Sequence, residues 1–269
     1  GQTTVVKWTI VNGSCQTEDE VSLYNAPIAN AGADQYHCDN TTTFTLAGNT
    51  ATPGTGTWTK VSGDGTITTP NSPTSTVTGV TVGQTTVVKW TIVNGSCQTE
   101  DEVTLTNAPA ANAGSDIQQC NTSTFTMSGN AATPGTGTWT IVSGPGSITD
   151  ANLATTTVTG VTAGGTTVLK WTIVNGSCQS EDEVTLTNAP AANAGTDIQQ
   201  CNTSTFTMAG NTATPGTGTW TIVSGPGSIT DANLSTTTVT GVTAGSTTVL
   251  KWTIVNGSCQ TEDEVTLTN

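Results

Sequence analysis

An internal repeat of about 80 residues constrains the fold of this chain more than any other feature of its sequence. Equivalent tryptophans and cysteines recur with steps of 82, 81 and 81 residues: Trp8, Trp90, Trp171 and Trp252, and Cys15, Cys97, Cys178 and Cys259. A period of this length exceeds that of most solenoid repeats and matches a small β-sandwich. We therefore predict residues 1–24 as the C-terminal hairpin of a truncated preceding repeat, followed by β-sandwich repeats at 25–106, 107–187 and 188–269.

Each segment ends in the same stretch, Lys-Trp-Thr-Ile-Val-Asn-Gly-Ser-Cys, followed by an acidic run. Asn-Gly between two alternating runs is a strong signal for a β-hairpin, because both central residues of a type I′ turn need positive φ. A turn centred on Asn175-Gly176 makes Val174 face Ser177 and Lys170 face Glu181. The same register predicts four cross-strand ion pairs: Lys7–Glu18, Lys89–Glu100, Lys170–Glu181 and Lys251–Glu262.

The rest of each repeat alternates short threonine-rich apolar runs with glycine and proline turns, which predicts about seven short strands and no helix. In the second repeat we expect a broken first strand over 108–114 and 117–119, then strands over 122–128, 138–142 and 155–161. Six tryptophans in the inward phase of their strands are predicted to form the cores: Trp58, Trp90, Trp139, Trp171, Trp220 and Trp252. The predicted fold class is all-β, with tandem immunoglobulin-like sandwiches of seven strands in a linear rod.

Charge and composition exclude several classes of partner. The net charge is −14 and arginine is absent, which argues against nucleic acid and against anionic membrane surfaces. No apolar run approaches about 18 residues, so no membrane-spanning segment is predicted. The chain opens within a repeat, and we expect it to be a segment of a longer secreted protein whose signal and anchor lie elsewhere. Its expected partners are further copies of the repeat upstream and downstream, and other chains by lateral self-association.

Three recurring motifs carry a family resemblance: Ala-Asn-Ala-Gly-Xaa-Asp at 29–34, 111–116 and 192–197, together with Thr-Gly-Thr-Trp-Thr and Asn-Gly-Ser-Cys. They resemble the PKD-like, immunoglobulin-like repeats of giant cell-surface proteins of Bacteroidota, gliding-motility adhesins of the SprB type among them. The resemblance covers all three whole repeats. It implies a β-sandwich that serves as a spacer in a long extracellular adhesin or filament at the cell surface, and it carries over no catalytic residue.

Seven cysteines and a single histidine favour disulfides over zinc. Pairing within repeats would join Cys38–Cys97, Cys120–Cys178 and Cys201–Cys259. In an immunoglobulin-like unit, however, the turn after the first strand and the tip of the last hairpin lie at opposite ends, on the order of 30 Å apart, whereas bridged Cα atoms lie within about 7 Å. We therefore favour clips between successive repeats, Cys38–Cys178 and Cys120–Cys259, with pairing within repeats as the alternative.

Acidic residues near the ends of the repeats raise the question of calcium, a hard cation that binds carboxylate oxygens. The candidate ligands are Asp34, Asp116, Asp197, Asp101 and Asp182. The alternative is that these side chains cap backbone N–H groups or protect strand edges, and we expect no resident cofactor. The only histidine, His37, occurs in one repeat, so it cannot serve a repeated catalytic function. A spacer is thus the favoured function, and a module that binds glycans or a partner through loops such as 133–137 is the alternative.

Overall fold

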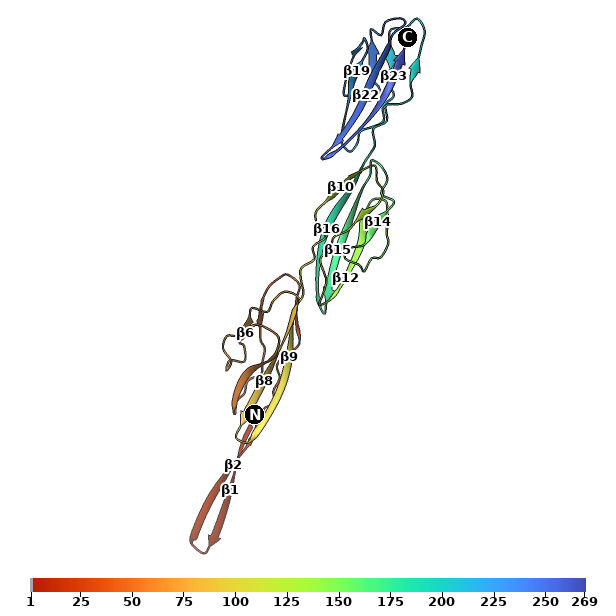
Figure 1. Cartoon of the computed structure of the whole chain (residues 1–269). Helices are drawn as coiled ribbons and strands as arrows, with labels where there is room; N and C mark the ends of the chain where they lie inside the picture. The colour runs from red at the N-terminus through yellow and green to blue at the C-terminus, as the bar shows by residue number, and fades with distance from the viewer. Residues whose placement is uncertain (1) are drawn as a thin grey trace. The chain divides into compact units, whose positions relative to one another are not determined.

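The computed structural model describes residues 2–269, and every regular element in this range is a β-strand (Figure 1). The predicted all-β class is therefore confirmed. By the density of their contacts, the residues divide into two compact units. The first contains the chain through Ala111 with 131–136 and 173–180, and the second contains 112–130, 137–172 and 181–269. No helix in the described range is long and apolar enough to cross a membrane.

The first sandwich has a four-stranded and a three-stranded sheet. The larger sheet has the order β3 (Gln35–His37), β9 (Cys97–Asn107), β8 (Gln84–Asn94) and β5 (Thr55–Ser62). The smaller has the order β4 (Thr43–Thr45), β7 (Thr76–Thr78) and β6 (Thr66–Ile67). β3 runs parallel to β9, and the other pairs are antiparallel. This is an immunoglobulin-like arrangement of seven strands in which the first strand joins the sheet of the last.

The second and third repeats have the same sheet orders. In the second they are β10 (Ile117–Cys120), β16 (Cys178–Ala189), β15 (Thr166–Asn175) and β12 (Thr136–Ser143), with β11 (Phe125–Thr126), β14 (Thr157–Thr159) and β13 (Ser147–Ile148). In the third they are β17 (Ile198–Gln199), β23 (Cys259–Thr268), β22 (Thr247–Asn256) and β19 (Thr217–Ser224), with β18 (Phe206–Thr207), β21 (Thr238–Thr240) and β20 (Ser228–Ile229).

The expected strand over 108–114 is wrong. This segment has no regular structure, and from Ala110 to Gly114 its backbone N–H groups are bonded to side chains instead of to a neighbouring strand. Ala111 N donates to Ser180 Oγ at 2.8 Å, and Ala113 N donates to Asp182 Oδ2 at 2.8 Å. The equivalent hydrogen bond occurs in the third repeat, where Ala194 N donates to Asp263 Oδ2.

Two tryptophans form the centre of each core. All six predicted core tryptophans are buried, and they pack as tilted pairs with ring centroids 4.9–5.0 Å apart: Trp58–Trp90, Trp139–Trp171 and Trp220–Trp252. In antibody domains, the tryptophan on the equivalent of β5 packs against a disulfide between the two sheets. Here a second tryptophan, from β8 in the first sandwich, occupies that place. The cysteines therefore do not lie at the centre of the core, as they do in antibody domains.

The predicted hairpin register is wrong by two residues. In the third repeat the strands pair as Asn256↔Cys259 and Lys251↔Glu264, so the two-residue turn is Gly257-Ser258 and not Asn256-Gly257. Asn94↔Cys97 and Asn12↔Cys15 show the same register. Only the glycine of each turn has positive φ, which suits the first central position of a type II′ turn.

The four predicted ion pairs nevertheless form. Lys89 Nζ lies 2.8 Å from Glu100 Oε2, Lys170 Nζ lies 2.9 Å from Glu181 Oε2, and Lys251 Nζ lies 3.0 Å from Glu262 Oε2. Lys7 and Glu18 also pair. A shift of two residues keeps each side chain on its face, and long side chains reach a diagonal neighbour. Hydrogen bonds from the lysine and then from a neighbouring glutamine hold the pKa of Glu100 and of Glu262 below the ordinary value.

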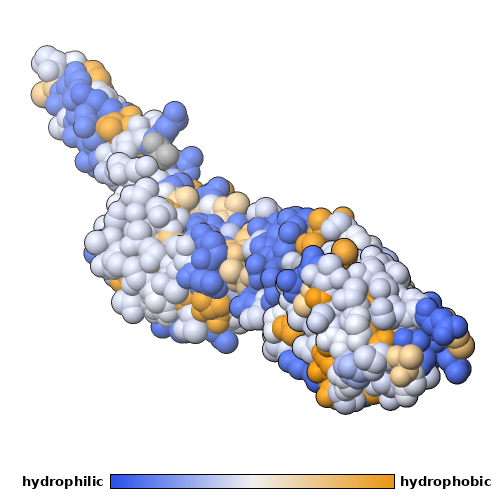
Figure 2. Space-filling view, turned by 90° about the horizontal axis from the view of Figure 1, so that it is seen from above, coloured by the Kyte–Doolittle hydropathy of each residue, from blue (hydrophilic) through white to orange (hydrophobic). Residues whose placement is uncertain are grey.

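The N-terminal hairpin, β1 (Gln2–Asn12) and β2 (Cys15–Asn25), forms a separate two-stranded sheet. Its sequence repeats that of the later hairpins, but its apolar face is exposed. Trp8 is 70% exposed, whereas its equivalent Trp252 is 1% exposed. Figure 2 shows a face that is largely near white, with blue patches and scattered orange ones.

Candidate functional site

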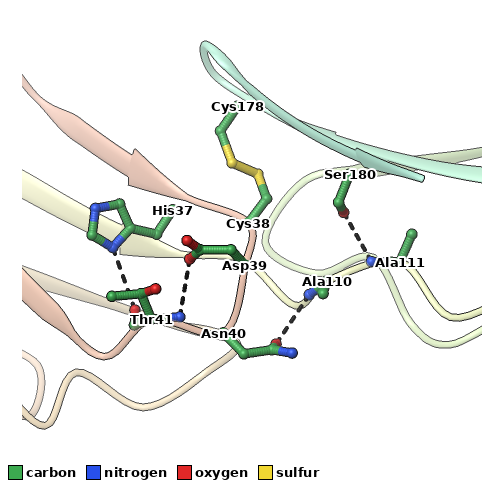
Figure 3. The surroundings of a disulfide bond; sticks show 9 residues. All are labelled: His37, Cys38, Asp39, Asn40, Thr41, Ala110, Ala111, Cys178 and Ser180. Carbon is green, nitrogen blue, oxygen red and sulfur yellow. Dashed lines mark hydrogen bonds between the residues drawn. A yellow bond between two sulfur atoms is a disulfide. The ribbon is translucent and has the colours of Figure 1, made fainter. Parts of the chain in front are cut away.

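A disulfide joins Cys38, directly after β3, to Cys178, the first residue of β16, with 5.9 Å between the Cα atoms (Figure 3). Cys38 belongs to the first repeat in the sequence and Cys178 to the second. Both cysteines lie within the first compact unit. Their separation falls in the normal range for bridged cysteines. We call this disulfide the first clip.

Contacts around the first clip join the same two repeats. Asn40, which has φ 62°, accepts a hydrogen bond at its Oδ1 from Ala110 N at 3.1 Å (Figure 3). The ring of Tyr36 lies so close to Gly176 that a Cβ added there would be 2.7 Å from ring carbon Cγ. Hydrogen bonds from Thr41 hold the pKa of Asp39 below its ordinary value, which favours the charged form of this carboxylate beside the clip.

The second clip, Cys120–Cys259, repeats this arrangement within the second compact unit, with 5.6 Å between the Cα atoms. Gln118 takes the place of Tyr36. Its Nε2 donates a hydrogen bond to the carbonyl oxygen of Asn256, and its side chain covers Gly257. An aromatic ring in one clip and an amide in the other therefore occupy the same position, two residues before the cysteine.

The structure does not join the cysteines within repeats, and the strand register explains why. His37 pairs with Asn107 at the C-terminal end of β9, whereas Cys97 is the first residue of that strand. Ten residues of extended strand separate Cys97 from Asn107, which is about 33 Å. Cys38 therefore lies far beyond bridging distance of Cys97. Cys15, Cys97 and Cys201 are free and exposed.

A comparison of the hairpin tip at Gly176, which contacts Tyr36, with the tip at Gly95, which does not, provides a test of the clip contacts. Gly95 and Gly176 both have φ 59°, but a Cβ at Gly95 meets nothing within 4 Å, whereas at Gly176 it meets Tyr36. We expect Gly176→Ala to lower the free energy of unfolding by about 1–3 kcal/mol more than Gly95→Ala, because the backbone strain is shared and only the overpacking differs. Denaturant unfolding of both variants measures this difference. Equal effects would show that the Tyr36 contact contributes nothing.

Each of the five candidate calcium ligands accepts a hydrogen bond from a backbone N–H group. Oδ1 of Asp34, Asp116 and Asp197 accepts from Thr104, Thr185 and Thr266 N respectively, each at 2.8 Å. Asp101 Oδ2 accepts from Ala31 N at 2.7 Å, and Asp182 is bonded to Ala113 as described above. Within residues 2–269 the structure gathers no three potential metal-ligating side chains into one group. Through these hydrogen bonds, the aspartates connect the segment before the first strand of each repeat to its last hairpin.

His37 also has a structural place. Its ring stacks on Phe44 with centroids 4.1 Å apart and an interplanar angle of 10°. Its Nδ1 lies 3.3 Å from the carbonyl oxygen of Thr41, close to the first clip (Figure 3). The only imidazole of the chain therefore supports the turn that follows β3.

Open clefts lie beside the loops considered as binding sites. In the third repeat a cleft of ≈ 640 Å³ is lined by residues of 212–219 and 233–235 and by Trp252. In the first repeat a cleft of ≈ 390 Å³ is lined by residues of 50–56 with Asn71 and Pro73. These loops are equivalent to the predicted 133–137 loop of the second repeat. Their lining consists largely of threonine, glycine and asparagine, without a charged side chain.

No family model matches the chain, and no curated protein matches it. Among solved structures, the I-band fragment I67–I69 of titin is similar with a TM-score of 0.40 and 10% identity, covering 91% of this chain and 99% of that one. Extracellular domains 3–5 of Drosophila OTK are similar with a TM-score of 0.39 and 12% identity, covering 90% and 96%. The N-terminal eight Ig domains of Down Syndrome Cell Adhesion Molecule are similar with a TM-score of 0.45 and 12% identity, covering 99% and 40%.

Proposed function

We propose that the chain is a non-enzymatic spacer of an extracellular protein, in which successive sandwiches are fastened covalently so that they carry tension. The observation that supports this function is the interlacing of the two clips. One closes a loop from Cys38 to Cys178, the other closes a loop from Cys120 to Cys259, and the loops overlap over residues 120–178. No cofactor enters the proposal.

Interlaced clips change the covalent route along which force passes. When the sandwiches unfold, the shortest route between the termini follows the backbone to Cys38, crosses to Cys178, and returns along the backbone to Cys120. It then crosses to Cys259 and follows the last residues to Asn269. Only this route can be pulled straight, and the remaining backbone stays in slack loops.

A chain pulled from its two ends is therefore expected to stretch to about 370 Å with both clips intact and to about 940 Å after reduction, at roughly 3.5 Å per extended residue. Single-molecule force spectroscopy with and without a thiol reductant measures both lengths. The Cys97→Ser variant is the matched control, because Cys97 is free and its loss leaves the route unchanged. An oxidised chain that reaches the longer length would contradict the proposal.

The disulfides support a cellular location for the chain, and the exposed N-terminal hairpin supports a sequence context. Disulfides form and persist in oxidising surroundings, which supports an extracellular site. The apolar face that β1 and β2 expose is buried in every whole repeat, where the equivalent hairpin belongs to a four-stranded sheet that packs with a three-stranded one, and this supports a further copy of the repeat before this hairpin. The motif resemblance supports the finer proposal of a cell-surface adhesin of the Bacteroidota type, related to gliding motility. Reach and tensile stiffness are the physical functions of such a spacer.

A binding module is the second candidate, and the recurring clefts beside 50–56 and 212–219 favour it. Threonine hydroxyls and an asparagine amide suit the hydroxyl groups of a glycan, and many weak copies would gain strength by avidity. A glycan array probed with the purified chain separates the two functions. The spacer predicts no saturable binding, whereas binding abolished by Asn233→Ala would establish the second function.

A further inference from the structure

Each clip lies beside a contact that needs no sulfur–sulfur bond. At the first clip, a Cβ added to Gly176 would lie 2.7–2.8 Å from three carbons of the Tyr36 ring, so the ring lies flat on this glycine. At the second clip, a Cβ added to Gly257 would lie 3.1 Å from both Cδ and Nε2 of Gln118, whose Nε2 also donates to the carbonyl oxygen of Asn256. In both cases a planar group, two residues before the bridged cysteine, covers the glycine of a hairpin turn.

The glycine at each turn serves the hairpin and the contact together. Gly176 has φ 59° and Gly257 has φ 56°, which suits the first central position of a type II′ turn. The same absence of a Cβ lets the planar group approach the backbone. The turn is formed by the pairing of its own strands, as in Asn256↔Cys259, and not by the disulfide. The surface on which Tyr36 or Gln118 packs is therefore complete before oxidation.

Cys38 has a contact to the second repeat on each side of it in the sequence. Tyr36 packs on Gly176, and Asn40 accepts a hydrogen bond from Ala110 N at 3.1 Å (Figure 3). These two contacts fix the cysteine between them. Reacting groups that are held in register react far more readily than groups joined only by a flexible tether.

We propose that the contact at each clip forms before the disulfide, and that the planar side chain two residues before the cysteine positions the pair for oxidation. Tyr36 is the positioning residue of the first clip and Gln118 that of the second. This inference rests on the proposed function and deepens it. The disulfide then locks a contact between repeats that is already closed.

Burial distinguishes the two cysteines of each clip. Cys38 is 5% exposed and Cys259 is 7% exposed, whereas Cys178 and Cys120 are half-buried. The half-buried thiol is therefore the one that a small-molecule disulfide, such as oxidised glutathione, reaches first.

The bond forms by thiol–disulfide exchange. The Cys178 thiolate attacks oxidised glutathione, which gives a mixed disulfide at Cys178 and releases one glutathione thiolate. The Cys38 thiolate then attacks the Cys178 sulfur and releases the second glutathione. Two protein thiols are oxidised, one glutathione disulfide is reduced to two glutathiones, and the two thiol protons pass to the released thiolates.

The test measures the redox equilibrium of each clip separately. The full chain, with its three exposed free cysteines replaced by serine, is equilibrated in buffers of reduced and oxidised glutathione, and the closed fraction of each clip is mapped by mass spectrometry. This fraction gives an effective concentration for each cysteine pair. We expect Tyr36→Ala to lower that of the first clip about 10-fold or more and to leave the second unchanged, because loss of a packed aromatic anchor commonly weakens a contact by this much. Gln118→Ala should lower only that of the second clip.

Two further variants separate positioning from a general effect on the strand. Gln35→Ala changes the neighbouring residue of β3, whose Nε2 donates to Thr45 O at 2.8 Å within its own repeat, and it should alter neither clip. Tyr36→Gln supplies the planar group that the second clip uses, and it should restore most of the effective concentration.

Contact without the disulfide is tested in the double variant Cys38→Ser with Cys178→Ser. The N–H of Ala110, which donates to Asn40, should stay protected from hydrogen exchange. Loss of this protection, unchanged effective concentrations in both alanine variants, or a fall at both clips in either variant would each overturn the inference. Unchanged values with both clips closed leave the proposed spacer standing, whereas a native chain that forms neither clip would refute the spacer itself.

Discussion

Removal of the second clip by Cys120→Ser with Cys259→Ser is expected to lower the free energy of unfolding by about 4–5 kcal/mol. The bond closes a loop over a sequence separation of 139 residues. In the chain-entropy model, a loop of this length restricts the unfolded chain by about 4.7 kcal/mol or slightly more. Both cysteines are replaced together so that no new free thiol remains. Guanidinium denaturation followed by tryptophan fluorescence measures the loss.

Cys97→Ser is the control for that variant, because it makes the same replacement at an exposed, unpaired cysteine. A surface change of this kind stays within about 0.5 kcal/mol. A double variant as stable as the native chain would mean that the second clip does not restrain unfolding. Reduction of the native chain should give a loss at least as large, because it opens both clips.

Replacement of Trp252 by alanine is expected to lower the stability of the third sandwich by about 3–5 kcal/mol, as for other large-to-small changes in cores. The indole is 1% exposed, packs against Trp220 with 5.0 Å between ring centroids, and donates from Nε1 to Asn211 Oδ1 at 3.2 Å. Its loss leaves a cavity and an amide oxygen with one partner fewer. Hydrogen exchange over residues 188–269 and denaturant unfolding measure the effect.

Trp8→Ala is a closely matched control, because Trp8 stands in the same local sequence as Trp252 but is 70% exposed. We expect it to change the free energy of unfolding by less than about 0.5 kcal/mol. The contrast isolates burial from sequence context. If both replacements had the same effect, the cores would not be centred on these tryptophans.

The sequence predicted the faces of the strands better than their register. Alternation assigned Trp171 and Ile173 to the core, and both are buried. It could not tell a turn at Asn-Gly from one at Gly-Ser, because a shift of two residues leaves every side chain on the same face. The strand expected over 108–114 is absent, and nothing in its own residues indicates that Asp182 and Ser180 would bond its N–H groups.

Prediction of the two disulfides required information from residues far apart in the sequence. Cysteine spacing together with an immunoglobulin-like topology favoured pairing between repeats, and the structure has this pairing. The sequence did not identify Tyr36 and Gln118 as residues that contact the hairpin tips. One side chain is aromatic and the other is an amide, so no common residue type marks this position. The signal that could have found them is positional, since each precedes its bridged cysteine by two residues.

Overlap of the two disulfide loops has a consequence for resistance to proteolysis. A protease that hydrolyses any single peptide bond between Cys38 and Cys259 cuts inside at least one loop, so no fragment is released. The severed ends stay attached through sulfur, and the folded sandwiches hold them in place. In a longer array with the same overlap, one nick anywhere along its interior would leave the thread unbroken.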